Sequence, residues 1–236
     1  MGRREKGQAA VETALTLPMF LFTFLGILQI SLAYHARLLT EYAAFKAARA
    51  GSVYRADCTR MKKAALMALV PSMSTGGKLG STDLKGLLQS TVEEVKDNKS
   101  RKGAPIVWID TELENTGEDF DKQLEAGDDK VQRIRVRVAY FFEYRIPFAN
   151  AIMVRSWLAT QRSLSWSLSG RDTTMLVKKA KNPEARGGVN VQLVDQVVQN
   201  VEDHKSFTSP IVASWSMRMM SDPLPDAKTS GEWDCK

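Results

Sequence analysis

The chain has 236 residues, of which 44% are hydrophobic and 25% charged, and its 33 basic and 27 acidic residues give a formal net charge of +6. This composition excludes a collagen-like, low-complexity or wholly disordered chain. Two cysteines and two histidines are too few for a disulfide scaffold, a four-thiolate zinc site or a three-histidine metal site. The mild excess of basic residues is smaller than a large nucleic-acid footprint normally carries.

The apolar residues are concentrated near the N-terminus. No aspartate, glutamate, lysine or arginine occurs between Glu12 and Arg37, so residues 13–36 form an uncharged segment of 24 residues. As a helix this segment extends about 36 Å, which is enough to cross a hydrocarbon core of about 30 Å. Its middle, residues 19–28, is apolar on every helical face, as in helices that lie in lipid or in a large core. We therefore expect one membrane span over about residues 13–36.

The orientation of this span follows from the charges and lengths on its two sides. Basic residues flank it on both sides: Arg3, Arg4, Lys6, Arg37, Lys46 and Arg49. The positive-inside rule places the first three in the cytoplasm, although the other three compete with them. The short N-terminal side and the long chain after the span favour a cytoplasmic N-terminus and an extracytoplasmic body.

A cleaved secretory signal is the alternative to an anchor, with residues 31–33 as a small-x-small cleavage site. The apolar stretch is too long for such a signal, and the helical pattern continues without a break through residues 36–49. A twin-arginine signal is also disfavoured, because no apolar residue closely follows the pair Arg3 and Arg4. The pattern favours a retained helix.

The start of the span carries a recognisable signature. A basic leader ends at Gly7, and Gln8-Ala9-Ala10-Val11-Glu12 leads into the apolar helix. This arrangement resembles the class III signal of type IV pilin-like proteins. The resemblance implies that a membrane peptidase cuts between Gly7 and Gln8, and that Glu12, the fifth residue of the mature chain, pairs with the new terminal amine during subunit docking. An amine and a carboxylate buried together cost far less than either buried alone. The simpler alternative is that Glu12 reaches the headgroup layer.

A finer resemblance covers residues 3–55 and is to the TadE-like minor pilins, or pseudopilins, of the tight-adherence (Flp) pilus. It is carried by Gln-Ala-Ala-Val-Glu, Pro18, Gly26-Ile27 and the alanine- and arginine-rich residues 42–51. The resemblance implies a structural or assembly subunit in the bacterial cytoplasmic membrane that supports pilus biogenesis and adherence, and it leaves open whether the subunit stays in the membrane or enters the pilus. Its implied partners are the membrane, a prepilin peptidase and other pilin-like subunits, with no nucleic acid, small-molecule substrate or cofactor.

The rest of the chain predicts an α+β fold, in which a long N-terminal helix packs on a small antiparallel sheet. Helical spacing continues beyond the membrane and recurs over residues 62–70, 82–95 and 189–201. Alternation of apolar and polar residues predicts strands over 105–113, 131–144 and 161–168, with loops over 72–81 and 115–130. The organisation is then a leader (1–7), a long helix (8–57), an extracytoplasmic domain (58–170) and a partly helical extension with a flexible end (171–236).

Three arginines, Arg133, Arg135 and Arg137, share one face of the second predicted strand. Such a row could bind acidic lipid, polysaccharide or nucleic acid. We favour a solvated sheet face or pairing with a neighbouring acidic strand, because no aromatic residues are interleaved for stacking on bases.

Cys58 and Cys235 both lie outside the cytoplasm in this topology, in a compartment that permits disulfides. A bridge between them is favoured over two free thiols. On the chain-entropy model a loop of this size contributes at most about 5 kcal/mol.

No catalytic motif stands out: the chain has no G-x-S-x-G, Cys-x-x-Cys, H-E-x-x-H or P-loop. His35 borders the span and His204 lies in a polar segment, so neither indicates a catalyst. The alternative to a pilus subunit is a signal-anchored, monomeric extracytoplasmic binding domain, for which cleavage after Gly7 has no use.

Overall fold

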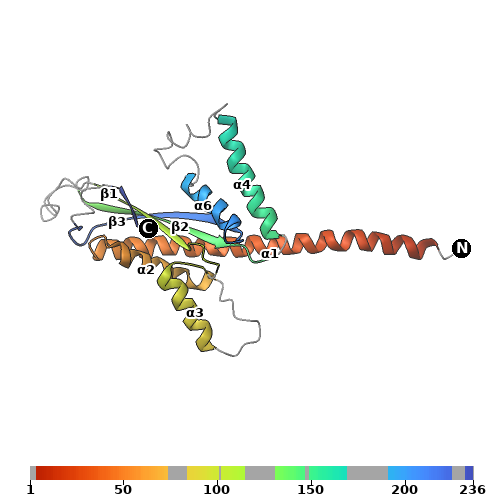
Figure 1. Cartoon of the computed structure of the whole chain (residues 1–236), viewed down its shortest axis with the longest axis horizontal. Helices are drawn as coiled ribbons and strands as arrows, with labels where there is room; N and C mark the ends of the chain where they lie inside the picture. The colour runs from red at the N-terminus through yellow and green to blue at the C-terminus, as the bar shows by residue number, and fades with distance from the viewer. Residues whose placement is uncertain are drawn as a thin grey trace.

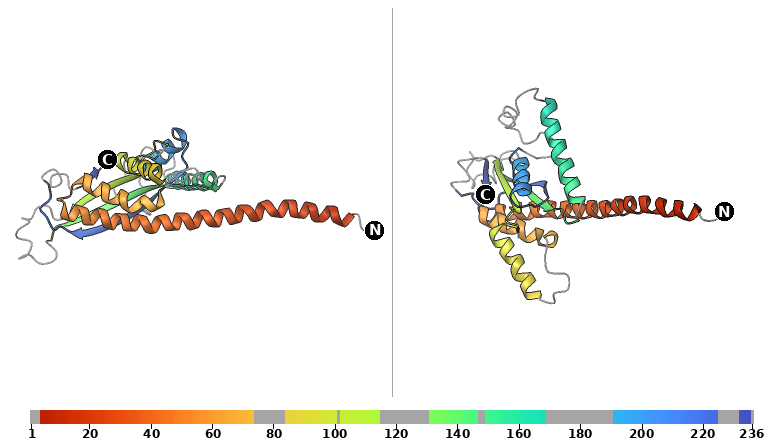
Figure 2. Two further views of the ribbon diagram at one scale, coloured as in Figure 1. Left: turned by 90° about the horizontal axis from the view of Figure 1, so that it is seen from below. Right: turned by 45° about the vertical axis from the view of Figure 1, so that its right-hand side comes forward.

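The computed structural model describes residues 4–73, 84–100, 102–114, 131–146, 149–168, 191–224 and 232–235. Its α+β architecture confirms the predicted class. A long helix, α1 (Arg4–Val53), lies against one face of an antiparallel sheet, and shorter helices complete the domain (Figure 1). The N-terminal part of α1 projects beyond the domain as a single rod, which both views of Figure 2 show.

The part of α1 near its C-terminal end packs through small residues. Ala43, Ala44, Ala47 and Ala48 are each 0% exposed. At Gly51, a Cβ atom would lie 2.6 Å from Met61 Sδ and 2.7 Å from the Ile134 Cδ1 atom, so the helix approaches its neighbours as closely as glycine permits. Small side chains on this face let α1 pack closely against both α2 and the sheet.

The chain reverses after α1 and forms α2 (Cys58–Leu69), which packs alongside it. Arg55 and Ala56 have positive φ values in the turn, and the Asp57 carboxylate caps α2 by accepting from the Thr59 N–H at 2.8 Å. The short helix η1 (Val70–Ser72) follows, and α3 (Leu84–Asp97) confirms the predicted second helix.

The sheet has four strands in the order β3-β2-β1-β4, and every neighbouring pair is antiparallel. Its strands are β1 (Val107–Glu114), β2 (Arg133–Glu143), β3 (Thr208–Arg218) and β4 (Glu232–Cys235). The first two confirm the strands predicted from alternation. On β2, Ile134, Val136 and Val138 are each 0% exposed and belong to the core that includes the alanines of α1.

Two helices cover part of the opposite face of the sheet. Val154 of α4 (Ala149–Leu168) and Val197 of α6 (Val191–Glu202) are both 0% exposed and pack in one cluster with Phe141 of β2. The position of α6 confirms the helix predicted from the valine spacing over residues 189–201. The charged end of this sheet face lies outside the cluster.

The prediction of a strand over residues 161–168 is wrong, because these residues continue helix α4. The packing of earlier residues favours the helix. Val154, Trp157 and Leu158, spaced by three and four residues, pack in the cluster with α6. β3 occupies the third sheet position instead. Two of the four strands therefore come from residues 171–236, and the sheet crosses the predicted boundary at residue 170.

The predicted loop over 115–130 and residues 74–81 of the loop over 72–81 lie outside the described residues.

Candidate functional site

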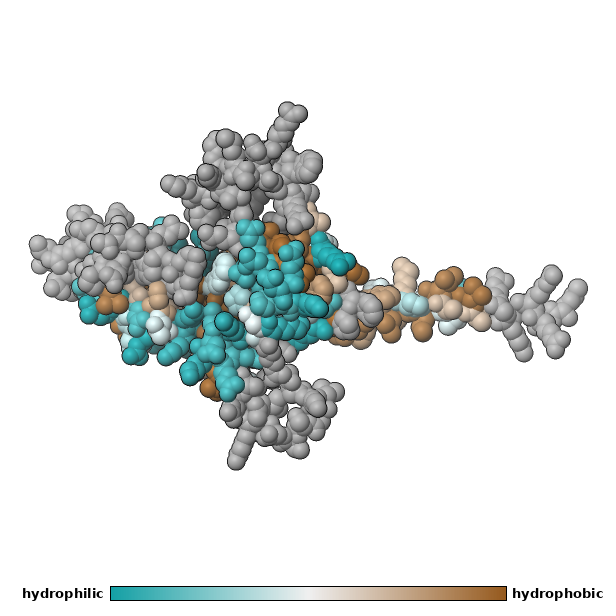
Figure 3. All heavy atoms as spheres, viewed as in Figure 1, coloured by the Kyte–Doolittle hydropathy of each residue, from teal (hydrophilic) through white to brown (hydrophobic). Residues whose placement is uncertain are grey.

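The candidate site begins with the uncovered stretch of α1. Every residue from Ala10 to Phe24 is exposed, including Met19 at 74% and Phe20 at 78%. Figure 3 shows brown and pale side chains along this projecting rod, in contrast to the teal surface of the domain. Among the described residues, α1 is the one helix long and apolar enough to cross a membrane, with the candidate segment beginning at Ala10. So large an exposed apolar surface indicates a site of interaction with lipid or protein.

The predicted processing and docking residues lie at the start of this stretch. Gly7 and Gln8 fall within the first turns of α1, so the proposed cleavage junction has helical backbone here. Glu12 is exposed at the beginning of the uncovered apolar surface, and its carbonyl accepts from Thr16 Oγ1 at 2.9 Å. The structure thus places one carboxylate at the edge of the apolar surface.

The domain first covers α1 at a buried amide. Gln29 is 0% exposed, and its Oε1 accepts from the Ile146 backbone N–H at 3.0 Å. Ile146 lies between β2 and α4, so this hydrogen bond fixes the base of α4 against α1. We did not single out Gln29 from the sequence, although an amide in the uncharged segment was an available signal.

Beyond Gln29 an apolar stripe continues along α1, and we call it the α1 ridge: the exposed Tyr34, Leu38 and Tyr42, the half-buried Phe45 and, from β3, the exposed Trp215. Tyr34 is 64% exposed and Tyr42 48%, although both lie on the half of the helix that packs on the domain. Phe45 stacks on Tyr42 with ring centroids 6.4 Å apart and meets the edge of Trp215 at 5.6 Å. Helical spacing aligns the ridge with Ile27 and Ile30, which are both 61% exposed and follow the uncovered stretch. The exposed apolar surface is therefore continuous from the rod onto the domain.

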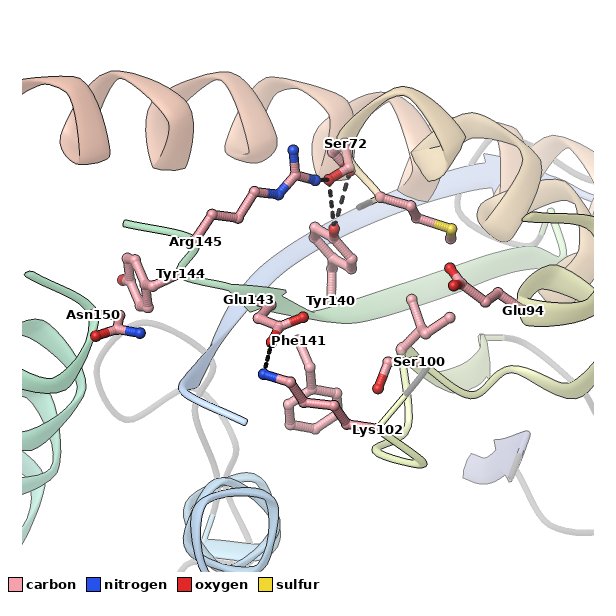
Figure 4. A pocket seen from close by; sticks show the side chains of 12 residues that line it. Ser72, Glu94, Ser100, Lys102, Tyr140, Phe141, Glu143, Tyr144, Arg145 and Asn150 are labelled. Carbon is pink, nitrogen blue, oxygen red and sulfur yellow. Dashed lines mark hydrogen bonds and ion pairs between the residues drawn. The ribbon is translucent and has the colours of Figure 1, made fainter. Parts of the chain in front are cut away.

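A pocket lies elsewhere, between η1, the segment after α3 and the end of β2 (Figure 4). It has a volume of about 380 Å³. Tyr140 Oη lies 3.1 Å from Ser72 Oγ, Arg145 Nη2 donates to the Ser72 carbonyl at 2.5 Å, and Lys102 pairs with Glu143. Burial raises the pKa of the Tyr140 phenol above 10.0, although its hydrogen bond to Ser72 and the charge of Arg145 oppose this.

These pairs tie η1 and the segment after α3 to the end of β2, which is a structural role. The described residues that line the pocket include no histidine or cysteine to serve as a nucleophile or base. The uncovered stretch and ridge of α1 are the stronger candidate site because their exposed apolar surface is so large.

The arginine row on β2 pairs with an acidic strand, as one of our two favoured interpretations predicted. In the register, Arg133, Arg135 and Arg137 face Glu114, Glu112 and Asp110 of β1. Arg135 Nη2 lies 2.7 Å from Glu114 Oε1, and Arg137 Nη1 lies 3.8 Å from Asp110 Oδ2. These contacts satisfy the charges of two of the three arginines within the sheet.

Cys58 begins α2 and is disulfide-bonded in the structure. The sequence contains one other cysteine, Cys235, whose backbone ends β4 opposite Ile109 of β1. The bridge between Cys58 and Cys235 stays a prediction, which peptide mapping of the exported protein would test.

Comparison with known proteins places a family signature on α1. Residues 7–49 match the family described as "TadE-like protein", and the chain thus carries a TadE-like domain there. The match begins at Gly7 and runs through the uncovered stretch into the packed part of α1. No curated protein and no solved structure matches the chain.

Proposed function

We propose that this protein is a minor pilin-like structural or assembly subunit of a tight-adherence pilus. The TadE-like domain over residues 7–49 supports this proposal, since that family is pilin-like and structural and not enzymatic. In the proposed topology α1 crosses the cytoplasmic membrane once, the N-terminus lies in the cytoplasm and the sheet domain lies outside. Other pilin-like subunits of the same system are its partners.

The observation that carries the proposal is the continuity of the exposed apolar surface along α1. A monomeric anchored domain needs an apolar surface only within the membrane. Here the surface continues past Gln29 along the ridge, where Tyr34, Leu38 and Tyr42 are 64%, 47% and 48% exposed. Apolar stripes at helical spacing are suited to packing against another helix. The ridge therefore favours subunit packing on both sides of the membrane boundary.

Processing by a prepilin peptidase makes a sharp prediction for the N-terminus. We expect the mature chain isolated from its native host to begin at Gln8, because Gly7 ends the basic leader directly before the apolar helix. N-terminal sequencing and intact mass of the membrane-extracted protein check this. A chain beginning at residue 1 or 2, or near Ala33, would contradict the assignment.

The role of Glu12 distinguishes a subunit from a simple anchor. Replacing a carboxylate in an apolar helix makes insertion easier, by up to about 3 kcal/mol at the membrane centre and less near its edge. A simple anchor therefore tolerates Glu12→Gln. An assembling subunit loses the partner of a buried terminal amine, and an unpaired buried charge is strongly destabilising.

The experiment is complementation in the native host, with surface pili and adherence compared at equal membrane levels of the protein. We expect Glu12→Gln to abolish or strongly reduce piliation. Glu12→Asp, the matched control, keeps the negative charge, and we expect this variant to retain part of the piliation. Normal piliation by Glu12→Gln would show that Glu12 has no docking role and would favour the monomeric anchored domain.

A further inference from the structure

Helix α4 starts beside α1, just after the uncovered stretch. The helix runs crosswise to α1 from a base beside it (Figures 1 and 2). The Gln29–Ile146 hydrogen bond fixes this base, and the Asn150 N–H donates to the Ile146 carbonyl at 3.0 Å in the first turn of α4. The height of α4 along α1 is therefore set by the fold.

That height coincides with the expected outer boundary of the membrane. The residues from Gln8, the first after the charged leader, to Phe24, the end of the unbroken exposed run, number 17 and rise about 25 Å as a helix. A hydrocarbon core of about 30 Å needs three to four more residues. The boundary then falls at residues 25–29, where the domain begins to cover α1. This end of the span lies before residue 36, the end expected from charge spacing, because Gln29 and Ala36 are buried against the domain. A helix that leaves α1 crosswise at this level has its first turns next to the membrane surface, and Figure 1 shows that its far end leans away from the N-terminal side.

The two sides of α4 differ accordingly. Val154 and Leu158 pack in the cluster with α6, which lies on the side of α4 farther from the N-terminus in Figures 1 and 2. Helical spacing places Ile152 and Ser156 about half a turn from Val154, and both are exposed, Ile152 at 66%. The face opposite α6 is thus turned toward the membrane side.

The composition of α4 is compatible with a position beside lipid headgroups. Its 20 residues contain no aspartate or glutamate, so no carboxylate on α4 repels lipid phosphates. Arg155 lines a pocket with Val201 and Glu202 of α6, and Trp157 packs in the cluster with α6. Of the exposed residues in the first turns of α4, Ile152 is the large apolar one outside these contacts.

We propose that the first turns of α4 lie on the extracytoplasmic surface of the membrane, with Ile152 in the headgroup layer. The contact fixes the tilt and rotation of the domain above the membrane. This inference rests on the membrane span of the proposed function. It does not depend on pilus assembly.

The test uses the full chain purified into vesicles of phosphatidylcholine and phosphatidylglycerol. A cysteine introduced at Ile152 carries an environment-sensitive fluorophore, and lipids with a nitroxide on the headgroup act as quenchers. Cys58 is disulfide-bonded and does not react, and the unsubstituted chain treated with the same reagent serves as the blank. The matched control is a label at Val92, an exposed apolar residue of α3 at 64%. A label at Leu21 reports on the span with an acyl-chain nitroxide.

We expect quenching at Ile152 to be several-fold greater than at Val92. Equal, weak quenching at Ile152 and Val92, with strong acyl-chain quenching at Leu21, would overturn the proposal and leave the membrane span intact. Absence of quenching at Leu21 would contradict the span itself.

Discussion

The two halves of α1 differ in side-chain size and in exposure, although they belong to one continuous helix. Up to Phe24 the surface carries large apolar side chains, all exposed, whereas the packed half presents Ala43, Ala44, Ala47 and Ala48, all fully buried. Large side chains suit contact with lipid or another helix, since they bury much area without requiring close backbone approach. Alanines suit the sheet side because they let the helix backbone approach a strand closely. Side-chain size, more than hydrophobicity, separates the exposed half from the packed one.

The packed half is also held from its far end. Ser52 Oγ donates to the Arg218 carbonyl at 2.6 Å, and Arg55 Nε donates to the Asp222 carbonyl at 3.0 Å. The Leu224 N–H donates to the Arg55 carbonyl at 3.0 Å. The segment after β3 therefore clamps the C-terminal end of α1, so the domain is fixed at the end farthest from the uncovered half.

The largest effect expected on the packed half comes from the predicted bridge. Cys58→Ser should lower the free energy of unfolding by about 2–4 kcal/mol, with about 5 kcal/mol as the chain-entropy ceiling for so long a loop. Cys235→Ser and the double variant should lose the same amount, because all three remove one bond. Thermal unfolding in detergent, followed by circular dichroism, measures this loss, and non-reducing peptide mapping identifies the linked fragment. Full alkylation of both cysteines without reductant would contradict the bridge and leave the pilus assignment untouched.

The contrast between the halves can be tested directly with one substitution made twice. Ala44→Leu adds three carbons to a fully buried position and should destabilise the domain by about 1–3 kcal/mol through overpacking. Ala14→Leu, at an exposed position of the same helix, should leave the unfolding temperature unchanged. The comparison is made at equal detergent concentration. Equal stability of the two variants would show that the alanine face is not the close contact described here.

The smallest effect concerns Tyr140, where the end of the sheet meets η1. Its raised pKa means that the folded protein favours the neutral phenol, so this stabilisation is present below pH 10.0 and is lost as the pH rises through the raised pKa. Tyr140→Phe should cost about 1 kcal/mol at neutral pH and flatten the fall in stability above pH 10.0. Denaturant unfolding on both sides of that pH measures it. Tyr42→Phe, at an exposed ring, should keep the profile of the unsubstituted protein.

The sequence predicted the elements whose signals are local and strong. The uncharged stretch of α1, the alternation of β2 and the valine spacing of α6 each fix a period and a length, and the structure contains all three elements. The alternation over residues 161–168 misled because serines and apolar residues that alternate are also compatible with an exposed helix. Packing of Val154 against α6 favours the helix earlier in the segment.

The strand β3 was missed although its own alternation is visible. Ile211, Ala213 and Met217 pack on the core, and Ser214 and Ser216 are exposed on the other face. Pro210 and the exposed serines weaken the pattern, as is tolerated at the edge of a sheet. Whether a strand lies at the edge depends on the assembled sheet. The sequence alone therefore could not show that Pro210 and the exposed serines are compatible with a strand here.

The sequence by itself predicted a prepilin-like junction at the start of α1, and it determined an apolar stretch long enough for a membrane, because charge spacing and apolar length are read along one helix. Only the tertiary structure decided where the domain covers that stretch, at Gln29, and which surface stays exposed beyond it. The Gln29–Ile146 hydrogen bond joins residues 117 positions apart, and the contact of Phe45 with Trp215 joins two elements at opposite ends of the chain. Such pairings depend on the register and order of strands that are remote in sequence. The level of α4 beside the span and the course of the α1 ridge therefore emerge only when the sheet has closed on α1.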